Sequence, residues 1–162
     1  MDVDRRTFLH SVSGLAAVSV MGTSSRRLTA ANVPAESDLP FLSLVDVAKL
    51  IRSKEISSTE LTSLMLKRIE KIDGTWNAYA TVMAKSAIKE ARQADREIAK
   101  GEYRGPLHGM PIAVKDLCYT KGVRTMAGCA VRMDFIPDHD ATVVSRYKQA
   151  GAVMLGKLNL TE

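Results

Sequence analysis

Apolar residues along the chain follow two patterns, helical spacing and short continuous runs, which predict an alternation of helices and strands. Four segments carry apolar residues at helical spacing: 44–53, 58–72, 84–100 and 141–150. Three short apolar runs have the length of strands covered on both faces: 78–83, 110–115 and 152–155. Strands that alternate with helices in this order predict an α/β fold.

Residues at the ends of these segments support the helix boundaries. Ser43 is expected to cap the first helix, and Ser57 with Glu60 three positions later has the spacing of a capping box. Gly74 lies where a left-handed residue would end the second helix. Asp140 is expected to cap the fourth helix.

The segments between and beyond these elements are predicted as connections. Residues 32–41 contain two prolines and suit an exposed linker, and 118–140 is expected to be a structured loop. Another loop is expected to begin at Gly156. We therefore expect a domain over 42–162, with an incomplete sheet that is poorly stable alone because its edges lack partners.

The first 31 residues have the features of an export signal. Arg5 and Arg6 precede a short apolar region diluted by Ser and Gly, and small residues surround Ala31. The arginine pair resembles the bacterial twin-arginine signal, which predicts recognition by that export machinery and a periplasmic or secreted protein. The alternative is an ordinary amphipathic first helix.

Composition narrows the class of protein. The 162 residues are 46% hydrophobic and 25% charged, as in globular proteins, and 23 Lys and Arg against 18 Asp and Glu give a net charge of +5. These basic residues are spread along the chain, and aromatics make up only 5%, so no nucleic-acid partner is expected. The sequence contains no charge-free apolar run of about 18 residues, so no membrane span is expected. No metal or other cofactor is predicted.

Lys115 is the candidate catalytic residue. It ends an apolar strand, and ligand sites of α/β sheets form at the carboxyl ends of strands. A lysine that is desolvated in a packed site can act as a base near neutral pH. The alternative is a solvated surface lysine that has Asp116 as a simple partner.

The residues around Lys115 resemble the lysine-bearing segment of the amidase signature family. That segment is Gly105–Asp116, GPLHGMPIAVKD. Further segments resemble the family in the expected order: GVRTMAGC at 122–129, DATVV at 140–144, AGA at 150–152 and GKLNLTE at 156–162. The resemblance covers about 42–162 and implies the N-terminal part of the amidase-signature fold, a mixed sheet flanked by helices.

The resemblance implies a hydrolase that cleaves carbon–nitrogen bonds of small amides with a Ser–cis-Ser–Lys triad. Lys115 corresponds to the family lysine, a general base that acts through a bridging serine on a nucleophilic serine. Neither serine has a counterpart here, because the 162 residues contain no Gly-Ser-Ser-Gly run. We therefore expect a truncated domain that is inactive alone. The alternatives are the A subunit of an amidotransferase that works on misacylated tRNA, and a non-catalytic remnant or binding module.

Other polar residues are assigned to structure. His108 is expected to make structural hydrogen bonds, and Lys157 is expected to be a solvated loop charge. His139 has no metal ligands at a suitable spacing. Cys118 and Cys129 are interpreted as two separate buried thiols, with a disulfide in an oxidising compartment as the alternative.

Overall fold

The computed structural model describes residues 34–160. The predicted export signal at 1–31, with Arg5 and Arg6, lies outside the described residues. Within the described part, no helix is long and apolar enough to cross a membrane.

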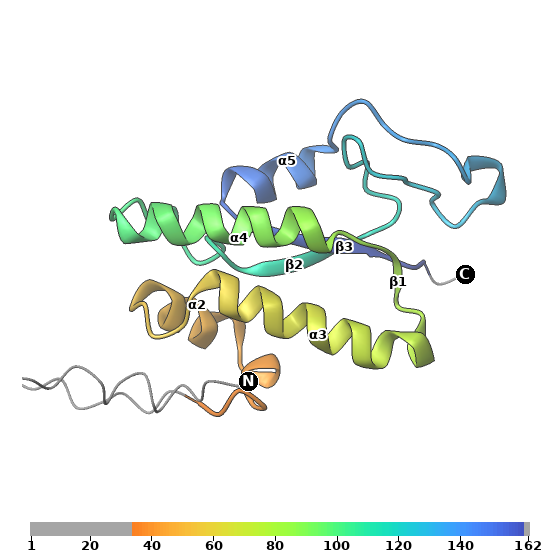
Figure 1. The fold of residues 1–162 in the computed structure, drawn as a ribbon. Coiled ribbons are helices and arrows are strands. Elements are labelled where there is room, and N and C mark those ends of the chain that lie inside the picture. Colours follow the sequence, from red (N-terminus) through yellow and green to blue (C-terminus); the bar gives the residue numbers. More distant parts are fainter. Residues whose placement is uncertain (1–33, 161–162) are drawn as a thin grey trace, which may run out of the picture. The chain divides into compact units, whose positions relative to one another are not determined.

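Helices and strands alternate in the predicted order (Figure 1). The α-helices are α2 (Leu44–Arg52), α3 (Ser58–Trp76), α4 (Ala84–Ala99) and α5 (Thr142–Gln149). The strands are β1 (Tyr79–Val82), β2 (Pro111–Lys115) and β3 (Val153–Leu158), and two short 3-10 helices are η1 (Leu39–Phe41) and η2 (Ala130–Arg132). All seven predicted helices and strands are therefore present.

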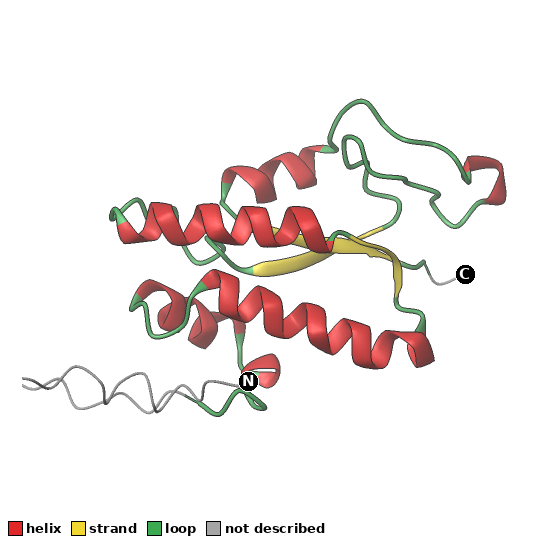
Figure 2. Ribbon diagram, viewed as in Figure 1, coloured by secondary structure: helices red, strands yellow, loops and turns green. Residues whose placement is uncertain are grey.

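The three strands form one mixed sheet in the order β1-β3-β2, drawn in yellow in Figure 2. β3 is central, because it pairs antiparallel with β1 and parallel with β2. Val153 and Leu155 pack with Ile69 of α3 and with Ala87 and Ala91 of α4. Met154 packs instead with Val144 of α5 and Val114 of β2. Successive residues of a strand point to opposite faces, so helices cover both faces of the sheet, as predicted.

β3 is longer than its apolar run predicts. The loop expected from Gly156 is wrong, because Gly156, Lys157 and Leu158 continue the central strand. Lys157 lies opposite Thr81 of β1 and Val114 of β2, so backbone pairing on both sides extends the strand beyond its apolar part. A Cβ atom on Gly156 would collide with the carbonyl oxygen of Thr81, which explains a glycine in this strand.

The helix ends agree with local sequence signals in some places and not in others. Ser43 caps α2, and Ser57 with Glu60 forms the predicted capping box of α3. The end predicted near Gly74 is wrong: α3 continues to Trp76, and Asn77 adopts the left-handed conformation with φ of 47°. Asn, like Gly, tolerates this conformation, so it can end a helix in the same way.

The predicted cap of α5 is also wrong. Ala141 holds the N-cap position, with no side-chain hydrogen bond to the helix. The Asp140 carboxylate instead accepts hydrogen bonds from the Lys121 backbone N–H (2.8 Å) and from Nζ of Lys148 (2.6 Å). Asp140 thus ties the 118–140 loop to α5.

Candidate active site

Lys115 is the last residue of β2, at the carboxyl ends of the parallel strands β2 and β3. Its Nζ donates a hydrogen bond to the backbone carbonyl oxygen of Asn159, which follows β3, at 2.9 Å. The side chain is exposed among the described residues, which differs from the desolvation expected from the sequence. The predicted strand-end position is confirmed, and the amine can be reached from outside this part of the chain.

A second lysine, Lys157, lies inside the same end of the sheet. Its side chain has no exposed surface, and its Nζ lies 3.3 Å from Oδ1 of Asp116. The same Nζ donates to the hydroxyl oxygen of Thr125 at 2.8 Å. The expectation of a solvated loop charge is wrong, because Lys157 belongs to the central strand and its buried amine contacts Asp116 and Thr125.

The environment of Lys157 acts in two directions on its charge. Burial lowers the pKa of Lys157 below its usual value, because desolvation penalises the ammonium form, and the nearby Asp116 carboxylate opposes this shift. Asp116 is therefore the partner of the buried lysine. The sequence alone indicated Asp116 only as a partner of its neighbour, Lys115.

Asp116 also organises the loop that follows it. Its Oδ2 accepts a hydrogen bond from the Met126 N–H at 2.9 Å, and its backbone carbonyl accepts one from the Ala127 N–H at 3.3 Å. Its own backbone N–H donates to the carbonyl of Leu158 at 2.8 Å. One aspartate thus joins the ends of β2 and β3 to the 125–127 turn.

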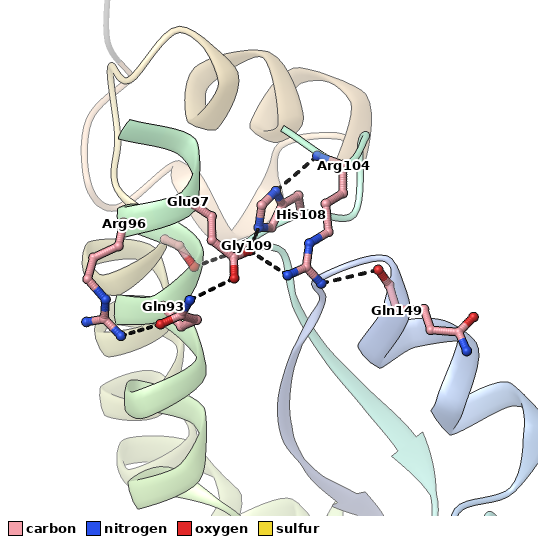
Figure 3. A network of polar contacts seen from close by, with 8 residues as sticks. Gln93, Arg96, Glu97, Arg104, His108, Gly109 and Gln149 are labelled. Atoms are coloured by element: carbon pink, nitrogen blue, oxygen red, sulfur yellow. Dashed lines mark hydrogen bonds and ion pairs between the residues drawn. The ribbon is translucent and has the colours of Figure 1, made fainter. Parts of the chain in front are cut away.

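His108 lies at the opposite, amino-terminal end of the same strands (Figure 3). It is buried, its Nδ1 accepts a hydrogen bond from the Arg104 backbone N–H (3.1 Å), and its Nε2 lies 2.9 Å from Oε2 of Glu97. Because Nδ1 is an acceptor, the proton of the neutral ring is on Nε2 and is donated to Glu97. Burial, together with the nearby Arg104 guanidinium, lowers the pKa of His108. The predicted structural hydrogen bonds are present.

The remaining predicted residues do not form a second reactive cluster. His139 lies beside Asp138 at the surface, and within residues 34–160 no group of three or more potential metal ligands is found. Cys118 and Cys129 are free thiols; Cys118 is half-buried, whereas Cys129 is exposed, so the expectation that both are buried is wrong.

Five serines in the described helices or at their starts have structural partners away from Lys115. Ser43 and Ser57 cap α2 and α3, and Ser58 donates its hydroxyl to the carbonyl of Gly109. Ser63 and Ser86 donate to backbone carbonyls one helical turn earlier. Lys115, Asp116 and Lys157 therefore lie at the same end of the β2–β3 pair, and the hydrogen bonds described for these five serines are with other residues.

Solved structures of amide hydrolases share this fold. Native peptide amidase from Stenotrophomonas maltophilia matches with a TM-score of 0.71 and 39% identity, over 76% of this chain and 26% of that chain. Fatty acid amide hydrolase matches with a TM-score of 0.71 and 25% identity, over 80% of this chain and 23% of that chain. The described residues are thus part of the α/β fold of these enzymes, as expected.

Sequence comparison gives the family. The model of the Amidase family matches residues 60–162, and the chain belongs to this family. The "Putative amidase AmiD" of Mycobacterium tuberculosis (strain ATCC 25618 / H37Rv) is 50% identical over 127 residues, 78% of this chain and 27% of that protein. The A subunit of glutamyl-tRNA(Gln) amidotransferase from Moorella thermoacetica is 48% identical over 125 residues, 77% of this chain and 26% of that protein. The chain spans about a quarter of the length of these relatives.

Proposed function

We propose that this chain is part of an enzyme that hydrolyses carbon–nitrogen bonds of small amides, with Lys115 as the general base. The observation that carries the proposal is the position of the Lys115 amine. It lies at the carboxyl end of β2, where it is held by the Asn159 carbonyl and is open to an approaching reactant. Membership of the Amidase family supports the same reaction class.

The proposed chemistry follows from the family resemblance. A serine hydroxyl attacks the amide carbonyl, and its proton passes through a bridging serine to the Lys115 amine. The carbon–nitrogen bond then breaks, the leaving amine takes up that proton, and an acyl-enzyme remains. Water attacks the acyl ester, and the acid is released as the serine hydroxyl is re-formed. Lys115 thus acts first as a base and then, as an ammonium group, as an acid.

The 162 residues supply the lysine of this reaction without the serines. They contain no Gly-Ser-Ser-Gly segment, and five serines at the described helices have the structural partners given above. We therefore expect no amide hydrolysis by the 162-residue polypeptide alone. An assay of ammonia release from a peptide amide, with this polypeptide as the only protein, checks this expectation.

A hybrid enzyme tests the role of Lys115. The segment of this chain that matches the Stenotrophomonas maltophilia peptide amidase would replace the matching segment of that enzyme, and ammonia release from a peptide amide would be measured. We call this protein the hybrid amidase. Loss of a general base lowers the rate by about 10²–10⁴-fold, so Lys115→Ala should lower kcat to this extent. Lys121→Ala, a matched change at an exposed lysine of the next loop, should leave kcat within about twofold. A Lys115→Ala variant as active as the Lys121→Ala variant would contradict the proposal.

A second candidate function is that of an amidotransferase A subunit, favoured by the 48% identity to the Moorella thermoacetica protein. Such a protein would use the same lysine to release ammonia for transfer to misacylated tRNA. The predicted export signal counts against it, since that reaction takes place in the cytosol. Ammonia transfer to glutamyl-tRNA(Gln) by this segment, grafted into the Moorella thermoacetica protein, would favour this alternative if the hybrid amidase is inactive.

The export of this protein is a separate proposal, supported by Arg5 and Arg6 and the weakly apolar stretch that follows them. Residues 1–31 fused to a reporter that folds in the cytoplasm should deliver it to the periplasm of a bacterium. Changing both arginines to lysine should stop delivery, and the same change at Arg26 and Arg27 is the matched control. Equal delivery by both altered fusions would contradict twin-arginine recognition.

A further inference from the structure

We propose that Asp116 and Lys157 are positioning residues, an ion pair that sets both the location and the charge balance of the Lys115 amine. This inference rests on the proposed function of Lys115. It assigns a role in the reaction to two buried residues other than the proposed base.

The ion pair of Lys157 and Asp116 is buried. The side chain of Lys157 is completely buried, and that of Asp116 is 4% exposed. Two charges removed from water are costly, and apolar residues of similar volume often stabilise a fold as well or better. A lysine near the carboxyl end of an otherwise apolar central strand is therefore not required for packing.

The ion pair connects the ends of the two parallel strands β2 and β3. Asp116 directly follows Lys115 in the chain, and Lys157 lies two residues before Asn159, whose carbonyl oxygen accepts the Lys115 hydrogen bond. The ion pair thus joins the donor side and the acceptor side of that contact. Displacement of either strand end would move the amine relative to Asn159.

Asp116 also holds a turn with strained backbone. Ala127 has a φ of 53°, which is uncommon for a residue with a Cβ atom, and Gly128 follows with a φ of 68°. The Ala127 N–H donates to the Asp116 carbonyl, and the neighbouring Met126 N–H donates to the Asp116 carboxylate. Strained backbone of this kind persists where surrounding contacts over-determine it, and it is frequent at active sites.

The ion pair also balances the negative charge of Asp116. Lys157 faces the Asp116 carboxylate, the Thr125 hydroxyl and the Cys118 thiol, and the two opposite charges of the pair balance each other, with Asp116 directly after Lys115 in the chain. Without Lys157, the Asp116 carboxylate would be unpaired next to Lys115 and would favour the ammonium form of the base. Without both charges, the balance beside Lys115 would be restored.

The pH dependence of kcat/KM in the hybrid amidase tests this role. Lys157→Met should lower kcat by up to about 10²-fold, as expected for a displaced catalytic group, and should move the acidic limb of the profile to higher pH. Lys157→Met with Asp116→Asn should return the limb to its wild-type position, because no unpaired charge remains. KM should change less than kcat in both variants.

A purely structural pair would behave differently. If Lys157→Met lowers kcat with an unmoved acidic limb, or if the double variant fails to return that limb, the positioning role is wrong. Failure of the proposed function is distinguishable, because then Lys115→Ala itself would retain activity.

Thr125 provides a milder variant, should the loss of Lys157 prevent folding. Thr125→Val keeps the ion pair and removes the hydroxyl that accepts from Lys157, and kcat should fall about tenfold, the effect of one hydrogen bond to a charged group. Thr125→Ser keeps the hydroxyl and should restore kcat. Wild-type kcat in Thr125→Val would overturn the proposal, as would equal losses in the Val and Ser variants.

Discussion

The two ends of the β2–β3 strand pair each contain a buried polar side chain, but the two are held in different ways. At the amino end, His108 is neutral and is bound between the Arg104 backbone and Glu97 (Figure 3). At the carboxyl end, Lys157 is bound to Asp116 and Thr125, and Asp116 directly follows the exposed Lys115 in the chain. A buried polar group is thus not by itself a sign of catalysis. The carboxyl end differs from the amino end in having the exposed amine of Lys115 at the end of β2, where a substrate could reach it.

The two ends also differ in the space around them. His108 and Glu97 border a cleft of about 480 Å³, which Arg104 and Lys148 also line, whereas Lys115 is not among its lining residues. We assign this cleft no part in the reaction, because its buried histidine is fully engaged in hydrogen bonds within the fold.

The largest effect on stability is expected at the amino end, from Gly151→Ala. A Cβ atom there would collide with Cδ2 of the buried His108, and the residue has a φ of +78°. Overpacking and the unfavourable φ together should cost about 2–4 kcal/mol. Gly101→Ala is the matched control, since Gly101 has a φ of +88° and a Cβ atom there would meet no atom within 4 Å. Urea unfolding of the hybrid amidase should rank the two variants in this order, and equal losses would show that the His108 contact is unimportant.

A smaller effect is expected from the protonation of His108. Its pKa in the folded protein is lowered from the ordinary value of 6.5, so below that pH the unfolded chain binds a proton that the folded chain resists. This contribution to stability is fully present above about pH 6.5 and is lost as the pH falls toward the folded-state pKa. His108→Gln should flatten the dependence of the unfolding free energy between pH 7 and pH 5. An unchanged slope would contradict a neutral, buried His108.

The smallest effect is expected from Arg104→Met. The guanidinium donates to Glu97 at 2.7 Å and to the Gln149 carbonyl at 3.3 Å, but its side chain is 42% exposed. Solvent screens such a pair, so the loss should be about 1 kcal/mol or less. Amide hydrolysis by the hybrid amidase should be unchanged. A loss as large as that of Gly151→Ala would mean that the amino end depends on its ion pair more than on its packing.

Much of the fold could be predicted because its signals are local. The Ser57–Glu60 capping box and the apolar run into Lys115 each lie within a few residues, and both are found at the expected positions. The end of α3 could not be predicted from its glycine, because Asn77 takes the left-handed conformation instead. Asp140 has the residue type of a helix cap, but contacts with Lys121 and Lys148 hold its carboxylate.

The candidate site could be predicted only in part, because its contacts connect distant residues. Lys115 could be identified from its own segment, whereas the partner of Asp116 is forty-one positions further along the chain. Burial of Lys157 depends on β3 being the central strand, and no local pattern states the strand order.

The most direct test of the central claim is chemical replacement of the amine at position 115. In a hybrid amidase with its other cysteines, including Cys118 and Cys129, changed to serine, Lys115→Cys should be inactive. Alkylation with 2-bromoethylamine should then restore ammonia release, because it rebuilds an amine of nearly the same length. The sulfur makes this amine a weaker base, so the acidic limb of the pH profile should move to lower pH. Restored activity with an unmoved limb, or no restoration, would contradict Lys115 as the proton acceptor.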